Sequence, residues 1–378
     1  MGAATTTPAA SKSGSQKAQP ARKFRSAVQQ HQEVVSTVNA VPSASSTTTY
    51  TIEIPSYGFL RGLWFQVTVS GGVGSGTAAV YQQNAPFSWI QTIQFLDVNS
   101  APIIFQIAGF DLYLIYKYGG YFFASDAKAA EEYSQGGVGG NSVFTLYLPL
   151  ELRARDALGS MPNTSSNTAY KVILTVAATT DVFSTAPAPT LPTNLRLDII
   201  QDDWWEPQPS DLQGRPQAQD PPSPDTTQYW SKASFSHASS GAIQDQVKRL
   251  GYLHREHILT FKNATPARIN SQCPDPLTVV YEGQQMTIQG RQLWRHMMTR
   301  WFGYTGAVDA ANGLDTGVFV LPFNRDFGHI VGAELGNGYL PTTPGTRLEF
   351  QGNIAATGSV EVLINDVSAA DELDITGS

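Results

Sequence analysis

The chain has 378 residues, of which only 15% are charged, and its 33 glycines and 23 prolines predict many short strands joined by turns. This length is typical of two domains. The single cysteine, Cys273, excludes an internal disulfide and a thiolate-rich metal cage, and no run of about 18 uncharged apolar residues predicts a membrane span. Residues 1–32 have no signal-peptide pattern, so we expect a soluble chain that is not exported by the usual route.

The first 32 residues form a basic arm without acidic residues. They hold five of the 24 basic residues and none of the 31 acidic ones, which leaves 19 basic against 31 acidic residues, or −12, in the remainder. A body this acidic is not expected to bind nucleic acid broadly or sequence-specifically, whereas a mobile basic arm suits an anionic membrane or a packaged genome. The candidate contact residues are Lys12, Lys17, Arg22, Lys23 and Arg25.

Two interpretations of the arm remain open. Residues 1–23 are almost devoid of apolar side chains, so we expect them to be disordered alone. Apolar residues then recur at helical spacing over residues 24–38, which predicts a short amphipathic helix that orders against a neighbour or a lipid surface. A strap packed on its own domain fits the same residues equally well.

The first half of the chain has the pattern of strands around one helix. Alternating apolar residues predict strands at 50–54 and 63–69, and a turn at 99–102 predicts a hairpin between 90–98 and 103–107. A helix follows directly over residues 108–118 and ends at two glycines. Further strands are predicted at 143–149, 171–177 and 195–200.

The second half repeats this plan after a connector with six prolines between residues 206 and 224. The predicted strands lie at 257–262, 277–281, 284–289, 318–321, 330–335, 348–350 and 360–364, with an aromatic-rich helix at 293–302. About seven strands in each half fit an all-β fold of two consecutive jelly rolls, eight-stranded sandwiches with short inserted helices. We expect an arm at 1–33, a first jelly roll at 34–205, a proline-rich linker at 206–228 and a second jelly roll at 229–378.

Two clusters contain residue types that bind metals or act in catalysis. The segment His254-Arg255-Glu256-His257 resembles a metal site, but it enters a strand, where histidines three apart are expected to face opposite ways. Acidic residues also flank two tryptophans over residues 202–206, as in a glycosidase cleft. A solvated strand end with both tryptophans packed at the domain junction is the stronger interpretation of this cluster. We expect no metal, no cofactor and no enzymatic activity.

Three fragments, taken in order, resemble a known family: residues 58–62 (GFLRG), residues 146–150 (LYLPL) and residues 317–319 followed by Asn324-Arg325-Asp326. The chain resembles the double jelly-roll major capsid proteins of the tectivirus type, the coat of tailless icosahedral double-stranded DNA viruses with an internal membrane. The proline-rich connector departs from the family pattern.

The resemblance implies a coat protein of the virion, assembled in the host cytoplasm from pseudo-hexameric trimers. Its implied partners are two further copies of the chain, neighbouring capsid trimers, penton and minor capsid proteins, and the internal membrane beneath the arm. Two alternatives remain: a carbohydrate-binding or glycoside-hydrolysing jelly roll built around Asp202 and Asp203, and a trimeric viral spike.

Overall fold

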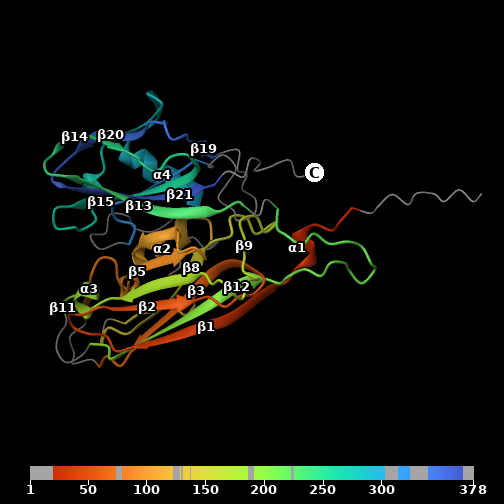
Figure 1. Ribbon diagram of the computed structural model, residues 1–378. Helices are drawn as coiled ribbons and strands as arrows, with labels where there is room; N and C mark the ends of the chain where they lie inside the picture. The colour runs from red at the N-terminus through yellow and green to blue at the C-terminus, as the bar shows by residue number, and fades with distance from the viewer. Residues whose placement is uncertain are drawn as a thin grey trace, which may run out of the picture.

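The computed structural model describes residues 20–73, 79–121, 128, 131–136, 138–185, 191–222, 225–302, 314–323 and 339–368. The described chain forms two strand-rich halves packed against each other, with the first half below the second in Figure 1. Strands dominate both halves and the helices are short, which confirms the all-β prediction. None of the described helices is long and apolar enough to cross a membrane.

The first half is a sandwich of two sheets with four longer strands each. One sheet has the order β1-β12-β3-β8-β7, with β9 beside β3, and its bounds are β1 Gln30–Ala40, β12 Asn194–Trp204, β3 Phe59–Ser70, β8 Ser142–Pro149, β7 Ser134–Gln135 and β9 Met161–Pro162. The other runs β6-β5-β10-β2, with β6 Pro102–Ile107, β5 Ile90–Leu96, β10 Lys171–Val176 and β2 Thr48–Glu53. Alternate side chains of β3 and β10 are buried in one core, as expected for strands with one inward face.

Short elements complete this half. A two-stranded ribbon pairs β4 Val80–Tyr81 with β11 Phe183–Thr185, and the helical segments are α1 Phe24–Ala27, η1 Phe87–Trp89, α2 Gly109–Tyr118 and α3 Thr179–Val182. Helix α2 begins where the Asp111 carboxylate accepts a hydrogen bond from the Ala108 backbone N–H at 2.9 Å. An acceptor in the first helical turn satisfies an N–H group that has no partner within the helix.

The second half repeats the sandwich. Its first sheet has the strand order β18-β15-β21-β13, with β19 beside β15. The bounds of these strands are β18 Val318–Pro322, β15 Leu253–Asn263, β21 Gly358–Val367, β13 Gln228–His237 and β19 Leu340–Pro341. Its second sheet has the strand order β14-β20-β16-β17, and the bounds of these strands are β14 Gly241–Gln246, β20 Leu348–Ile354, β16 Leu277–Tyr281 and β17 Gln284–Gln289. The helical segments are η3 Asn270–Gln272 and α4 Arg291–Phe302.

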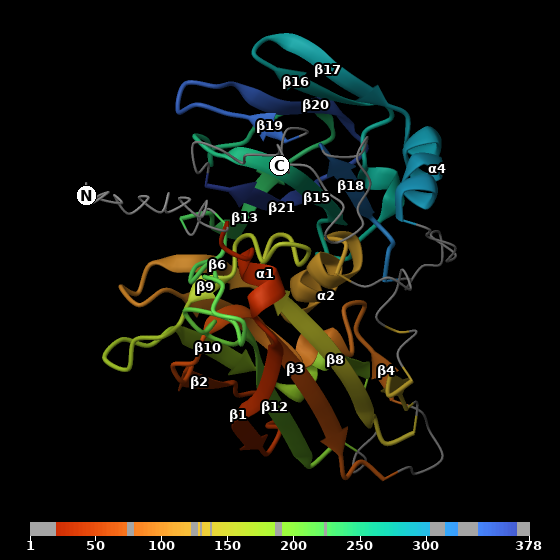
Figure 2. The ribbon, with the colours of Figure 1, turned by 90° about the vertical axis from the view of Figure 1, so that its right-hand side faces the viewer.

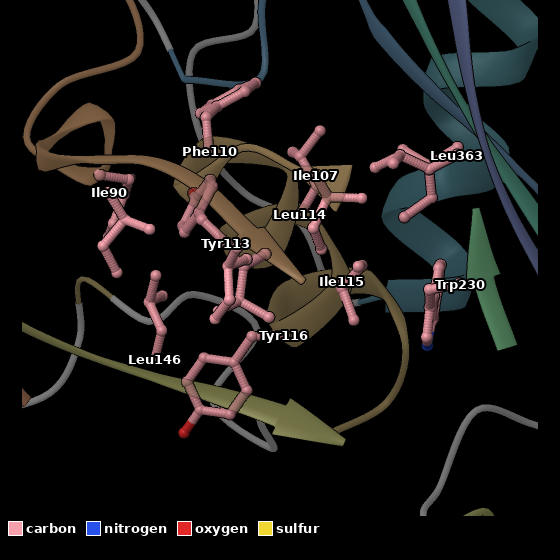
Figure 3. Close-up of a cluster of buried hydrophobic side chains, with 14 of the residues drawn as sticks. Ile90, Ile107, Phe110, Tyr113, Leu114, Ile115, Tyr116, Leu146, Trp230 and Leu363 are labelled. Atoms are coloured by element: carbon pink, nitrogen blue, oxygen red, sulfur yellow. The ribbon is translucent and has the colours of Figure 1, made fainter. Parts of the chain in front are cut away.

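The two halves share one sheet and one core. A parallel bridge between Ile104 of β6 and Trp230 of β13 joins an inner sheet of each half into a nine-stranded sheet. Helix α2 is buried along its whole length at this junction. Figure 3 shows α2 side chains such as Leu114 and Ile115 extending toward Trp230 and Leu363 of the second half, and all four belong to the same apolar cluster.

The structure corrects the predicted helix over residues 24–38. Only Phe24–Ala27 is helical, and Gln30–Ala40 forms strand β1, paired antiparallel with β12 from Gln30↔Trp204 to Ala40↔Leu195. Strands β13 and β14 were not predicted, and the predicted strand at 330–335 lies outside the described residues.

Candidate functional site

The first group of interest lies where the N-terminal arm meets the first half. Phe24, Val28, Phe59, Ala157 and Trp204 form a small apolar cluster, separate from the main core, which we call the arm-base cluster. The Phe24 and Phe59 rings meet edge to face with centroids 4.9 Å apart. Burial of Phe24 fixes the chain before β1 to the body. Figure 2 shows α1 above the N-terminal end of β1.

Three of the five predicted arm residues lie in this described base. The Arg22 backbone bonds to both Pro216 and Ala218 of the connector at 2.9 Å, and its guanidinium lies 3.6 Å from Asp211. Arg25 lies over the Trp204 ring, 4.0 Å from its centroid. Lys23 is exposed.

The base of the arm is therefore a strap on its own chain. The other two predicted residues, Lys12 and Lys17, lie outside the described residues. Which partner the five basic residues contact stays a prediction.

The acidic cluster at 202–206 differs from the predicted solvated strand end. Asp202 and Asp203 are 3% and 0% exposed, and Trp204 is buried, whereas Trp205 is 46% exposed. The prediction failed because β12 is an inner strand, paired with β1 and β3 up to Trp204, and because the arm base and Arg61 pack against its last side chains. Glu206 keeps the predicted exposure, whereas Trp205, which was predicted to pack at the domain junction, is exposed, and Trp204 packs in the arm-base cluster.

Asp202 belongs to a buried ion-pair group that sequence reasoning missed. Arg61 donates from Nε to Glu151 at 3.0 Å and from Nη1 to Asp202 at 3.2 Å. Trp204 Nε1 donates to the other Glu151 oxygen at 2.6 Å, and Gln30 donates to Asp202 at 2.9 Å. No spacing signal links these residues, because Glu151 and Asp202 lie 90 and 141 positions beyond Arg61.

This arrangement does not favour glycoside hydrolysis. A hydrolase needs two carboxyl groups that face the substrate on either side of the bond to be cleaved. Asp202 and Glu151 instead converge on one guanidinium, which holds both in a fixed ion pair.

Asp203 has a separate environment. Its carboxylate is fully buried, and the nearest basic group is His31 of the paired strand, with 3.9 Å between Nδ1 and Oδ2. His31 stacks on Tyr57 with ring centroids 4.2 Å apart. Burial raises the pKa of Asp203 to about 8, since a charged carboxylate is poorly solvated in the interior. The side chain is therefore largely protonated at neutral pH.

The two histidines of the metal-like segment meet, contrary to prediction. The pairing of β15 with β21 shifts register between His254 and Glu256, which marks a β-bulge at Arg255. The extra residue turns both imidazoles to one side, and His254 Nδ1 lies 2.8 Å from His257 Nε2. Burial lowers the pKa of His254 to about 4. Within the described ranges, no three His, Cys, Asp or Glu side chains gather as metal ligands.

Buried charges join the two halves around α2. Lys117 of α2 donates to both carboxylate oxygens of Asp315 at 2.9 and 3.0 Å, and Tyr118 donates to the same carboxylate at 2.6 Å. At the other end of the helix, Asp111 pairs with Lys232 of β13 at 2.9 Å. Each of these contacts crosses from the first half to the second.

Two buried arginines add further bonds across the junction. Arg268 donates to the Gln83 carbonyl at 2.8 Å and to Asn84 at 2.9 Å in the first half, and to the carbonyls of Leu314 and Thr316 in the second. Arg255 donates to the Gly119 carbonyl at 2.8 Å. The α2 helix and the 83–84 turn are therefore bonded to the second half by charged side chains.

Comparison with known proteins gives matches in structure but not in sequence. No protein-family model and no curated protein matches the chain. Among solved structures, the crystal structure of the STIV MCP has 17% sequence identity and a TM-score of 0.61, and the match covers 92% of this chain and 99% of the STIV chain.

Two further matches come from whole-virus structures. A chain from the atomic structure of Sulfolobus Turreted Icosahedral Virus has 13% identity and a TM-score of 0.63, over 90% of this chain and 91% of the other. The quasi-atomic model of the PBCV-1 virus capsid gives 10% identity and a TM-score of 0.55, over 90% and 94%. The chain therefore has the double jelly-roll fold of the major capsid proteins of icosahedral viruses.

Proposed function

We propose that this chain is the major capsid protein of an icosahedral virus. The observation that carries the proposal is the extent of the match, because 92% of this chain aligns with 99% of the STIV MCP. Both sandwiches and the junction between them are thus included. A subunit with two similar halves, held rigidly by buried ion pairs, suits a shell built from repeated copies.

The subunit acts by its shape and not by chemistry. Three copies around a three-fold axis present six similar sandwiches, which make a pseudo-hexameric tile that can contact six neighbours. Neighbouring trimers, penton and minor capsid proteins are its further partners, the virion is its location, and the host cytoplasm is the place of assembly. No enzymatic role is included, because the buried carboxylates Asp202 and Glu151 are engaged by Arg61.

The arm contributes the contact with the inner membrane. Arg22 and Arg25 hold the base of the arm to the body, so the reach of the arm begins near residue 20. Lys12 and Lys17 precede that point, and Lys23 is exposed beside it. Each lysine near an anionic lipid surface contributes up to about 1 kcal/mol, and the contacts of many trimers add together.

The mass of the purified chain in solution tests the subunit proposal. Light scattering should give three times the 40.9 kDa of one chain, and negative-stain electron microscopy should show a particle of hexagonal outline. A stable monomer under dilute and concentrated conditions would count against the shell subunit.

Flotation with anionic vesicles tests the arm separately. Deleting residues 1–19, which leaves the arm-base cluster intact, should preserve the trimer but reduce vesicle binding. The double variant Lys12→Gln, Lys17→Gln, a matched control for length, should reduce binding by roughly 30-fold, from about 2 kcal/mol of lost attraction. Equal flotation of all three proteins would assign the arm to a protein or genome contact instead.

A further inference from the structure

A cavity of about 280 Å³ opens beside the arm-base cluster, and neither the capsid fold nor the arm accounts for it. It lies between residues of β1, β3, β8 and β12, which Figure 2 shows side by side below α1. Three aromatic side chains and four polar or charged ones line it together with Ala154: Trp64, Tyr121, Tyr147, Gln30, Arg61, Glu151 and Asp202.

The aromatic wall is an ordered group of rings. The Trp64 and Tyr147 centroids are 4.5 Å apart, and those of Tyr121 and Tyr147 are 6.1 Å apart. Gly62 makes this arrangement possible, since a Cβ at that position would collide with the Tyr147 hydroxyl. The face of each ring carries partial negative charge, so a wall of three rings attracts a cation.

The polar side of the cavity also favours positive charge. One guanidinium, that of Arg61, faces two carboxyl groups, Glu151 and Asp202. Burial raises the pKa of Glu151, so the net charge of the three groups lies between 0, with Glu151 protonated, and −1, with all three ionised. Burial alone lowers the pKa of Arg61, but the charges of Glu151, Tyr147 and Asp202 together outweigh burial and the net shift is upward. The surroundings thus stabilise the charge of Arg61, and a ligand in the cavity meets that charge together with the two carboxyl groups, so the three groups offer an anion no net positive charge.

We propose that this cavity binds a small organic ammonium ion. Aromatic rings beside carboxylates are the combination that recognises alkylated or primary ammonium groups, because the rings replace the water of the alkyl surface and the carboxylates balance the charge. A bare metal ion fits less well, since it must coordinate carboxylate oxygens directly and Arg61 already engages both carboxylates, whereas an ammonium ion needs only negative charge near the rings. The volume of about 280 Å³ lies near the lower end of the range for ligand pockets and limits the ligand to a small molecule.

The charge requirement is tested on the full chain without any substitution. Choline chloride is titrated by calorimetry against 3,3-dimethylbutan-1-ol, its uncharged carbon isostere, with sodium chloride at matched ionic strength as background. Choline should bind saturably and at least roughly tenfold more tightly than the isostere, the ratio expected for a desolvated cation on aromatic rings. Equal binding of the two compounds, or no binding of choline, overturns the proposal.

Variants then locate the site. Asp202→Asn removes one negative charge from the cavity and should weaken choline binding by roughly tenfold, and Trp64→Leu by roughly 3- to 30-fold. The matched control is Asp198→Asn, the same change on the same strand, at a residue whose partners Thr37 and Arg196 lie outside the cavity. Unchanged affinity in both site variants would refute this location, and the choline and isostere comparison decides the charge question if a variant fails to fold.

Discussion

Replacing Lys117 with methionine should destabilise the junction of the two halves by about 3 kcal/mol or more, because the change leaves a buried carboxylate without its closest cation. The Lys117 side chain is 1% exposed and that of Asp315 is 6% exposed, and their ion pair has two contacts at 2.9 and 3.0 Å. Methionine has a similar volume and no charge, so the packing around α2 is kept.

The magnitude follows from what remains around Asp315. Breaking a buried pair by removing one partner costs about 3–5 kcal/mol. The Tyr118 hydroxyl still donates to Asp315 at 2.6 Å, and the nearby Arg268 attracts it, so the lower end of that range applies. For 378 residues the unfolding entropy is about 0.8 kcal/mol/K, so 3 kcal/mol lowers the Tm by about 4 °C.

Urea unfolding followed by tryptophan fluorescence and by circular dichroism measures the effect. The control is Lys171→Met, which removes a pair with Glu53 whose side chains are 37% and 67% exposed, and which should cost less than about 1 kcal/mol. Adding Asp315→Leu to Lys117→Met should recover most of the loss, since no unpaired charge remains buried. Equal losses in Lys117→Met and the control would refute the assignment of stability to this pair.

Two further predictions concern the arm base and the neighbouring acid. Because the folded pKa of Asp203 is about 8, above the ordinary carboxyl value of about 3.9, its contribution to stability is complete below about pH 4 and is lost as pH rises toward 8. Asp203→Asn should therefore gain stability relative to the unmodified protein between pH 5 and pH 8 in urea titrations, and parallel pH profiles would contradict this. Trp204→Leu should raise the rate of trypsin cleavage after Lys23 and Arg25 by roughly tenfold, since the ring no longer packs the arm, whereas Trp205→Leu, at an exposed ring, should not change it.

Local patterns were sufficient for the elements whose partners are close in sequence. The hairpin of β5 and β6 and the following helix α2 were predicted within two residues at each end, because a turn and helical spacing are both short-range signals. The aromatic helix at residues 293–302 was also found, but its buried face is narrow: Trp294 and Met298 are buried, whereas Leu293 is 55% exposed.

Strand β1 shows why local spacing can mislead. Phe24 and Val28 are buried four residues apart, as in a helix, but they belong to the arm-base cluster before the strand begins. Val34, which extended the helical spacing, is 55% exposed. What decides the conformation is the pairing with β12, about 160 residues away, for which a single sequence contains no signal.

The candidate site was the least predictable part. The bulge at Arg255 that brings His254 and His257 together arises from the pairing of β15 with β21. The Arg61 group likewise combines residues from three distant segments. A sequence shows that such side chains exist, but only tertiary pairing determines that they meet.

The way each half is closed also sets an order of events during synthesis. β1 pairs with β12, the first and last strands of the first half, and β13 pairs with β21 at the two ends of the second. The first sandwich therefore contains all of its own strands once Trp204 has been made, and it can fold while the second half is still being translated. At that stage Lys117 of α2 lacks its contact with Asp315, and the α2 side chains that meet Trp230 are not yet covered, so the nascent chain exposes an apolar, partly charged face until the second half has been made. Slow translation after the proline-rich connector would prolong this exposure, so we expect newly made chains to aggregate most readily in the interval before β21 is complete.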